Sequence, residues 1–145
     1  MSVSIEQLRI ECKRVREAGK RVYDERIFSY MCKSIFPTGW CGCLSYVLGA
    51  VLSKKYPKEL FDYVSGIIYC DDGHMISHAW IEHGDLVLDI TADQFEGINE
   101  EVIIVPRNSS DFHLKFCRDS VHPTVTDLSG YHEELAVIEK LKGTS

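Results

Sequence analysis

Hydrophobic residues recur at intervals of three and four in four parts of the chain, the spacing of helices with one buried face. The first pattern begins at Ile5, and Ser4 with Gln7 three positions later forms the capping-box signature of a helix start. Gly19 is expected to end or bend this helix. A second helix is expected from Tyr23 to Ile35, where the Phe-Pro step that follows closes the pattern.

The third pattern runs from Cys41 to about Lys55, between a glycine-rich turn and the dipeptide Tyr56-Pro57. Its apolar stripe is unusually wide, which predicts a buried helix. The stripe consists of Leu44, Val47, Leu48, Val51 and Leu52. The fourth pattern predicts a helix from Tyr131 to Lys142, whose closing lysines complement the helix dipole.

Between the third and fourth helices the pattern changes to alternating, β-favouring residues, which predict strands. The expected strands are Val64–Tyr69, Ala79–Ile81, Leu86–Ile90, Val102–Val105 and Phe112–Phe116. The segment Cys117–Gly130, which is rich in Ser, Thr and Asp and contains Pro123, is expected to be irregular. Helices followed by mostly antiparallel strands predict an α+β fold.

The strands on either side of Gly84-Asp85 are expected to form a hairpin, because this dipeptide suits a tight turn. Side chains alternate between the two faces of a strand. With a loop of two or of four residues, His78 and Asp89 share one face and lie within reach of each other. A histidine beside a carboxylate is either a feature of sheet packing or a general base held in one tautomer.

The chain has 145 residues, 45% hydrophobic and 26% charged, which fits one globular domain spanning residues 1–145. The net charge of -6 argues against a nucleic-acid partner, since phosphate binding needs clustered basic residues. The basic cluster Lys13–Arg21 is interleaved with Glu17 and is interpreted as a solvated helix face. No membrane span and no signal peptide is recognisable, so a cytoplasmic location is expected, with most of the six cysteines as free thiols.

Cys41 is the candidate nucleophile, because it stands at the start of the third helix. Free backbone N–H groups and the positive end of the helix dipole favour a thiolate there. The order Cys41, His78, Asp89 then matches thiol enzymes, in which the histidine assists the cysteine and the carboxylate orients the histidine. Cys43 is the competing thiol, and it lies about 200° further around the helix axis.

Three stretches carry a resemblance to a known family: Gly-x-Cys-Gly-x-x-Ser at residues 39–45, His-Ala-Trp at 78–80 and Asp-Ile-Thr-Ala-Asp-Gln-Phe at 89–95. Together they resemble the transglutaminase-like branch of the papain-type cysteine enzymes, in particular the small bacterial transglutaminase-core proteins that include lasso-peptide maturation peptidases. The resemblance implies a nucleophile-bearing helix packed on an antiparallel sheet. It also implies a triad of Cys41, His78 and Asp89 that acts on a peptide or protein amide through a thioester.

Three further residues are candidates for supporting roles at this site. Gln94 is a candidate for the oxyanion hole, together with the backbone N–H of Cys41. Trp40 and Trp80 flank the candidate residues and are expected to line the substrate site. No cofactor is expected.

Two other interpretations compete with this one. Cys70, His74 and His78 are spaced by four and could suggest zinc, but the turn sequence between the first two argues against a metal site. The remaining histidines, His83, His113, His122 and His132, are expected at the surface. The alternative to an enzyme is a catalytically inert binding module on the same fold.

Overall fold

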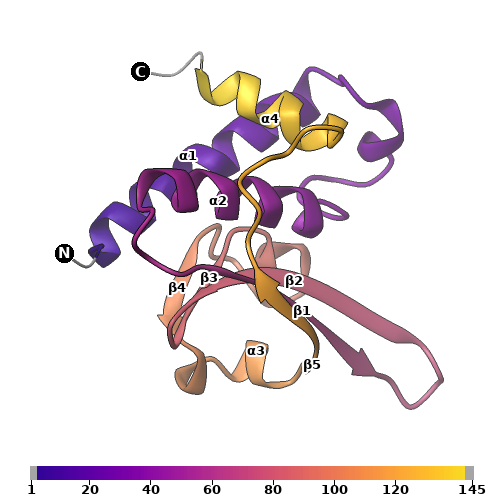
Figure 1. The fold of residues 1–145 in the computed structure, drawn as a ribbon. Coiled ribbons are helices and arrows are strands. Elements are labelled where there is room, and N and C mark those ends of the chain that lie inside the picture. Colours follow the sequence, from indigo (N-terminus) through magenta and orange to yellow (C-terminus); the bar gives the residue numbers. More distant parts are fainter. Residues whose placement is uncertain (1–2, 143–145) are drawn as a thin grey trace.

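Three helices lie on one face of a five-stranded antiparallel sheet in the computed structural model, which describes residues 3–142 (Figure 1). These three are α1 (Ile5–Asp24), α2 (Cys41–Lys55) and α4 (His132–Lys142), and the short helix α3 (Asp111–Leu114) lies on the other face (Figure 1). The 3-10 turns are η1 (Ser29–Cys32), η2 (Ala92–Gln94) and η3 (Arg107–Ser109). The strands are β1 (Asp62–Tyr69), β2 (Met75–His83), β3 (Leu86–Asp89), β4 (Ile103–Pro106) and β5 (Cys117–Pro123), in the order β4-β3-β2-β1-β5. The α+β prediction is confirmed.

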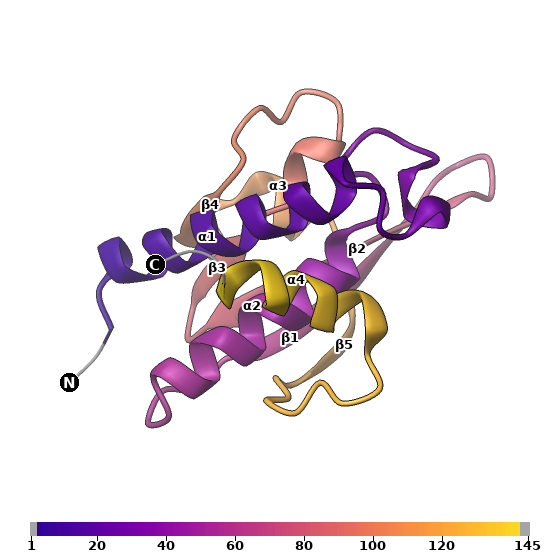
Figure 2. The same cartoon turned by 90° about the horizontal axis from the view of Figure 1, so that it is seen from above.

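Helix α2 joins the helical layer to the sheet, because it contacts β1 and β2 below it as well as α1 and α4 (Figure 2). Leu44, Val47 and Leu52 of its stripe are fully buried. Helix α1 continues past Gly19 to Asp24, so the expectation that Gly19 ends or bends this helix is not met. A β-carbon at Gly19 would lie 2.6 Å from Leu44 Cδ2, so the glycine allows α1 to approach α2 closely.

The second helix expected from Tyr23 to Ile35 is wrong. Helix α1 ends at Asp24, Arg26 turns the chain with a φ of 53°, and only η1 forms in the rest of the segment. Ile27 and Ile35 are 45% and 81% exposed, so only Phe28 and Met31 of the predicted apolar stripe pack against the core. An isolated short helix without such packing is unstable in water.

Two predictions for residues 112–130 are also wrong. The expected strand Phe112–Phe116 is instead the short helix α3 and the turn after it, because the Ser110 side chain caps the His113 N–H. Within the segment expected to be irregular, residues 117–123 form β5, which pairs with β1. Most side chains of this edge strand are exposed, so it shows no apolar alternation in the sequence.

The β2–β3 hairpin has the two-residue loop Gly84-Asp85, since His83 pairs with Leu86 across it. The ladder between these strands extends only as far as the pair Ile81 and Leu88, which leaves the first part of β2 without a neighbour on that side. His78 is therefore on a stretch of β2 that pairs only with β1, opposite Gly66.

A second, smaller core lies on the face of the sheet away from the three long helices, where α3 is seen below the sheet in Figure 1. Its buried residues are Val64, Trp80, Val87 and Phe116. The rings of Phe95 and Phe112 pack on this cluster. It forms the hydrophobic surroundings of His78, which contacts four of its aromatic rings.

Arg16 corrects the interpretation of the basic segment of α1 as a wholly solvated face. This side chain is 7% exposed and donates to Asp93 at 2.7 and 2.9 Å and to the Ile90 carbonyl at 2.9 Å. The contacts hold the loop after β3 against α1. Among residues 3–142, no helix has both the length and the apolar character needed to cross a membrane.

Candidate active site

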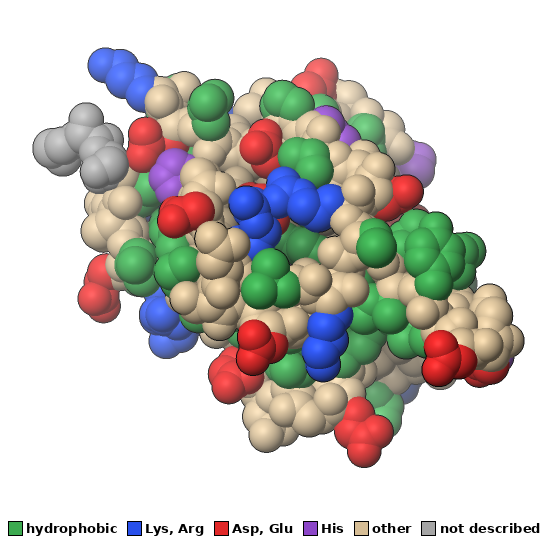
Figure 3. Space-filling model, turned by 90° about the horizontal axis from the view of Figure 1, so that it is seen from below, with side chains coloured by type: hydrophobic (Ala, Val, Ile, Leu, Met, Phe, Trp, Pro, Cys, Tyr) green, Lys and Arg blue, Asp and Glu red, His purple; other side chains and the backbone are tan. Residues whose placement is uncertain are grey.

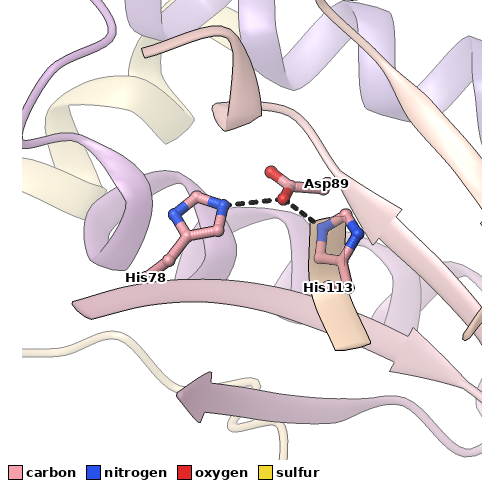
Figure 4. Close-up of side chains that lie close together, drawn as sticks. All are labelled: His78, Asp89 and His113. Atoms are coloured by element: carbon pink, nitrogen blue, oxygen red, sulfur yellow. Dashed lines mark hydrogen bonds and ion pairs between the residues drawn. The ribbon is translucent and has the colours of Figure 1, made fainter. Parts of the chain in front are cut away.

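His78 and Asp89 meet as the hairpin register predicts. Nε2 of His78 lies 2.7 Å from Asp89 Oδ2, and both side chains are fully buried (Figure 4). The other carboxylate oxygen accepts the backbone N–H of Thr91 at 3.0 Å. The loop after β3 therefore fixes the carboxylate, and the carboxylate fixes the ring.

The charges of this pair stabilise each other. Burial alone would raise the pKa of Asp89, but the charge of His78 and hydrogen bonds from His113 and His78 hold it well below its ordinary value. Burial alone would lower the pKa of His78, but the charge of Asp89 and the hydrogen bonds with Asp89 and Cys41 raise it to about 9. His78 is therefore readily held as an imidazolium.

Cys41 is the first residue of α2, and no side chain caps the helix start, so the thiol is carried at the positive end of the helix dipole. Burial acts to raise the pKa of this thiol. The hydrogen bond and charge of His78, with the N–H of Ala79, outweigh burial and lower the pKa below its ordinary value. Because Nε2 of His78 is bonded to Asp89, the ring nitrogen left for the thiol is Nδ1.

Cys43 lies in a different environment on the same helix. It is 8% exposed, and burial together with Glu134 and Glu133 raises the pKa of its thiol strongly. All six cysteines are free thiols, and Cys12 is also deeply buried, with a pKa raised to about 12 by burial. Of the two cysteines of α2, only Cys41 has a thiol pKa that is lowered from its ordinary value.

His113 is the part of the site that the sequence did not indicate, and its expected surface position is wrong. It is 2% exposed, and its Nε2 lies 2.6 Å from Asp89 Oδ2, on the other side of the carboxylate from His78 (Figure 4). Its Nδ1 lies 2.6 Å from Ser110 Oγ. An ionised carboxylate oxygen can only accept, so both rings carry a proton on Nε2 and donate it to Asp89.

This tautomer matters for His78, because it leaves Nδ1 unprotonated and able to accept the thiol proton when the ring is neutral. The Ser110 side chain both caps α3 and contacts the His113 ring. The spacing Ser-x-x-His was therefore the only sequence signal for the second histidine. A Ser-x-x-His pattern is too common to identify a site without the fold.

Gln94 lies beside the ring of His78, with Nε2 3.3 Å from Nδ1. It is therefore on the thiol side of the imidazole, where an oxyanion donor is needed. Trp40 and Trp80 were expected to line the substrate site. Both are only 1% exposed, so neither lines an open site. The Nε1 of Trp40 donates to the Met31 carbonyl at 3.3 Å, and that of Trp80 donates to Glu82 at 3.0 Å. Both rings support the site from within the core.

One group among residues 3–142 has the donor types of a metal site: His78, Asp89 and His113, whose ligand atoms lie within 4.8 Å of one another. The two nitrogens approach one carboxylate oxygen at 2.6 and 2.7 Å, which is hydrogen-bond geometry with both protons in place. All three side chains are fully buried. A metal ion would have to displace both protons and would find no open coordination position.

The zinc set considered from the sequence is not assembled. His74 lies in the exposed turn of the β1–β2 hairpin and pairs with Asp72 at 2.8 Å, while His78 is bonded to Asp89. A cavity of about 800 Å³ lies between α2 and α4, and neither Cys41 nor His78 lines it.

Comparison with protein-family profiles, curated proteins and solved structures gives no match to this chain. The class of site is therefore defined by geometry: a cysteine at a helix start, a histidine on a neighbouring strand, and a buried aspartate that accepts from two histidines.

Proposed function

We propose that this protein is a cysteine amidohydrolase or acyltransferase of the papain/transglutaminase-like type. Cys41 would be the nucleophile, His78 the general base and acid, and Asp89 the residue that orients His78. The observation that supports this most directly is the shared imidazole: His78 is bonded to Asp89 through Nε2 and interacts with the Cys41 thiol. The nucleophile-bearing helix packed on an antiparallel sheet agrees with that type of core.

The chemistry follows from the charges of the site. The Cys41 thiolate attacks the carbonyl carbon of a peptide or glutamine amide, and the carbonyl oxygen becomes an oxyanion. The backbone N–H of Cys41 and the side chain of Gln94 are proposed to donate to that oxygen. When the C–N bond breaks, His78 gives its Nδ1 proton to the leaving amine, and a thioester to Cys41 remains.

The thioester is resolved by a second nucleophile. A water molecule, or an amine in a transfer reaction, loses a proton to Nδ1 of His78 as it attacks the thioester carbonyl. The C–S bond then breaks, and the acid or the new amide leaves with Cys41 restored as a thiolate. Hydrolysis and transfer share every residue up to this step.

The proposal is tested by labelling the intact protein with iodoacetamide at about pH 6, where ordinary thiols are almost fully protonated. One thiol should react much faster than the other five, and peptide mapping should place it at Cys41. Cys41→Ser should abolish the fast phase, and Cys43→Ser is the matched control. Uniformly slow labelling would contradict the proposal and favour the inert binding module.

A further inference from the structure

The outer half of the β1–β2 hairpin projects beyond the strands on either side of it (Figure 1). On the β1 side, pairing with β5 ends at Ile67 and Cys117. On the β2 side, pairing with β3 ends at Ile81 and Leu88. Residues 75–77 of β2 are therefore an open sheet edge that leads toward His78.

This edge lacks the usual protection of an exposed strand. Tyr69 and Met75 are 67% and 63% exposed, and Ile76 is 37% exposed. The outer hairpin, residues 67–77, contains no Lys or Pro, the residues that commonly block edge pairing. Seen from below, hydrophobic side chains gather at the right-hand end of the molecule, toward which the hairpin projects (Figure 3). An exposed apolar edge of this kind marks an interaction surface.

The ladder register shows which backbone groups face the open side. His83 and Leu86 flank a two-residue loop and so form a hydrogen-bonded pair, and the pattern repeats at every second residue of β2. The N–H and C=O groups of Ser77 and Met75 therefore point away from β1, toward the open edge. Among residues 3–142, no backbone hydrogen bond fills these positions.

The Cys41 thiol lies in line with this edge. The N–H of Ala79 belongs to the same alternating set, and it hydrogen-bonds to Cys41. The sulfur therefore lies on the open side of β2, near the place where a neighbouring strand would supply its next acceptor. Since β-strands rise about 3.3 Å per residue, that place is roughly 7 Å from the backbone groups of Ser77.

We propose that the substrate binds as an extended peptide segment that adds a strand to the Met75–Ser77 edge and so brings one of its carbonyl groups to Cys41. The inference rests on the proposed function and specifies its substrate as a polypeptide in extended conformation, not a free amino-acid amide. Backbone hydrogen bonds supply the affinity in strand addition, and alternate side chains supply specificity. The exposed Met75 and Ile76 on the two faces of the edge favour apolar neighbours.

The test compares electrophiles on the full chain. Chloroacetyl-Val-Thr-Val-amide and acetyl-Val-Thr-Val-chloromethyl ketone present the reactive carbon at either end of a β-favouring peptide, and iodoacetamide has no peptide. Each rate at Cys41 is divided by the rate of the same reagent with free mercaptoethanol. At least one peptide reagent should react on the order of tenfold faster than iodoacetamide by this ratio, with saturation.

N-methylation of single amides in the faster peptide identifies the binding mode. In an added strand, the amides that face β2 alternate with amides that face solvent. Methylation of one alternate set should therefore abolish the rate advantage, and methylation of the other set should leave it. Equal effects at all positions, or no rate advantage, would overturn the inference while selective iodoacetamide labelling still supports the proposed function.

A variant gives an independent check on the protein side. Ser77→Pro removes an N–H that faces the open edge and leaves the β1 ladder intact, so the advantage of the peptide reagent over iodoacetamide should fall about tenfold. Leu60→Ser removes an exposed apolar residue at the other end of β1 and should keep the advantage. A dimer that the Ser77→Pro change dissociates in size-exclusion chromatography would show that a second copy fills the edge and would also overturn the inference.

Discussion

Asp89→Asn is the most informative single change, because it keeps the shape of the side chain and removes only its charge. In the wild type, Asp89 and Cys41 raise the pKa of His78 from 6.5 to about 9 despite complete burial of the ring. One pKa unit corresponds to about 1.4 kcal/mol, so the imidazolium is stabilised by roughly 3 kcal/mol relative to water after the opposing effect of burial is included. Without the carboxylate, burial is left to lower the pKa of His78.

The loss of the Asp89 charge should change the pKa and the labelling rate of the Cys41 thiol. The reactive ion pair exists above the lowered pKa of Cys41 and is lost as the pH rises through about 9, where His78 deprotonates. In Asp89→Asn the imidazolium is no longer favoured, so the pKa of Cys41 should rise toward that of an ordinary thiol. The rate of iodoacetamide labelling at about pH 6 should then fall on the order of 10- to 100-fold.

The assay is a pH series of labelling rates at Cys41, with circular dichroism to show that each variant is folded. Asp85→Asn is the matched control, since it makes the same chemical change at an exposed position on the same hairpin. The wild type should show a reactive phase at a lower pH than an ordinary thiol, whereas Asp89→Asn should show a single rise at the alkaline pH of an ordinary thiol. A folded Asp89→Asn protein that keeps the wild-type profile would refute the role given to the carboxylate.

Three other changes test separate parts of the structure. Cys43→Ala should leave the fast labelling of Cys41 within about twofold, because the pKa of Cys43 is raised by burial and its thiol is not the reactive one. His113→Gln removes one of the two imidazoles that donate to Asp89, so the pH profile of labelling should move upward with a roughly tenfold lower rate at about pH 6. His122→Gln on β5 should not move the profile. Gly66→Ala should lower the free energy of unfolding by about 1–3 kcal/mol in urea denaturation, because a new β-carbon would lie 2.7 Å from Phe116 Cβ. Ser65→Ala is the reference variant. An unchanged midpoint of unfolding in Gly66→Ala would contradict this packing.

The parts of the fold that were predictable are those with local signals. The capping box at Ser4 fixes the start of α1, and the wide apolar stripe fixes α2. The Gly84-Asp85 loop fixes the hairpin register, and with it the meeting of His78 and Asp89. Each of these depends on neighbours a few residues apart, so sequence spacing contains the information.

The errors occur where distant contacts outweigh local pattern. Strand β5 forms from exposed, mostly polar residues because β1 offers it a ladder of backbone partners. The predicted Tyr23–Ile35 helix fails because only part of its apolar stripe packs against the core, while Ile27 and Ile35 stay exposed. Arg16 leaves the solvated face expected for its segment because Asp93 and the Ile90 carbonyl lie within reach only after folding.

The sequence by itself determined the candidate nucleophile, its base and its orienting acid, because a helix start and a two-residue hairpin loop are local features. Only the tertiary structure decided that His113 shares Asp89 with His78, since the contact joins residues 24 positions apart through the packing of α3 beneath the sheet. The burial of Trp40 and Trp80 and the open edge of β2 beside Cys41 were likewise decided by which strands and helices become neighbours. Those are properties of the assembled layers, and no short stretch of the chain contains them.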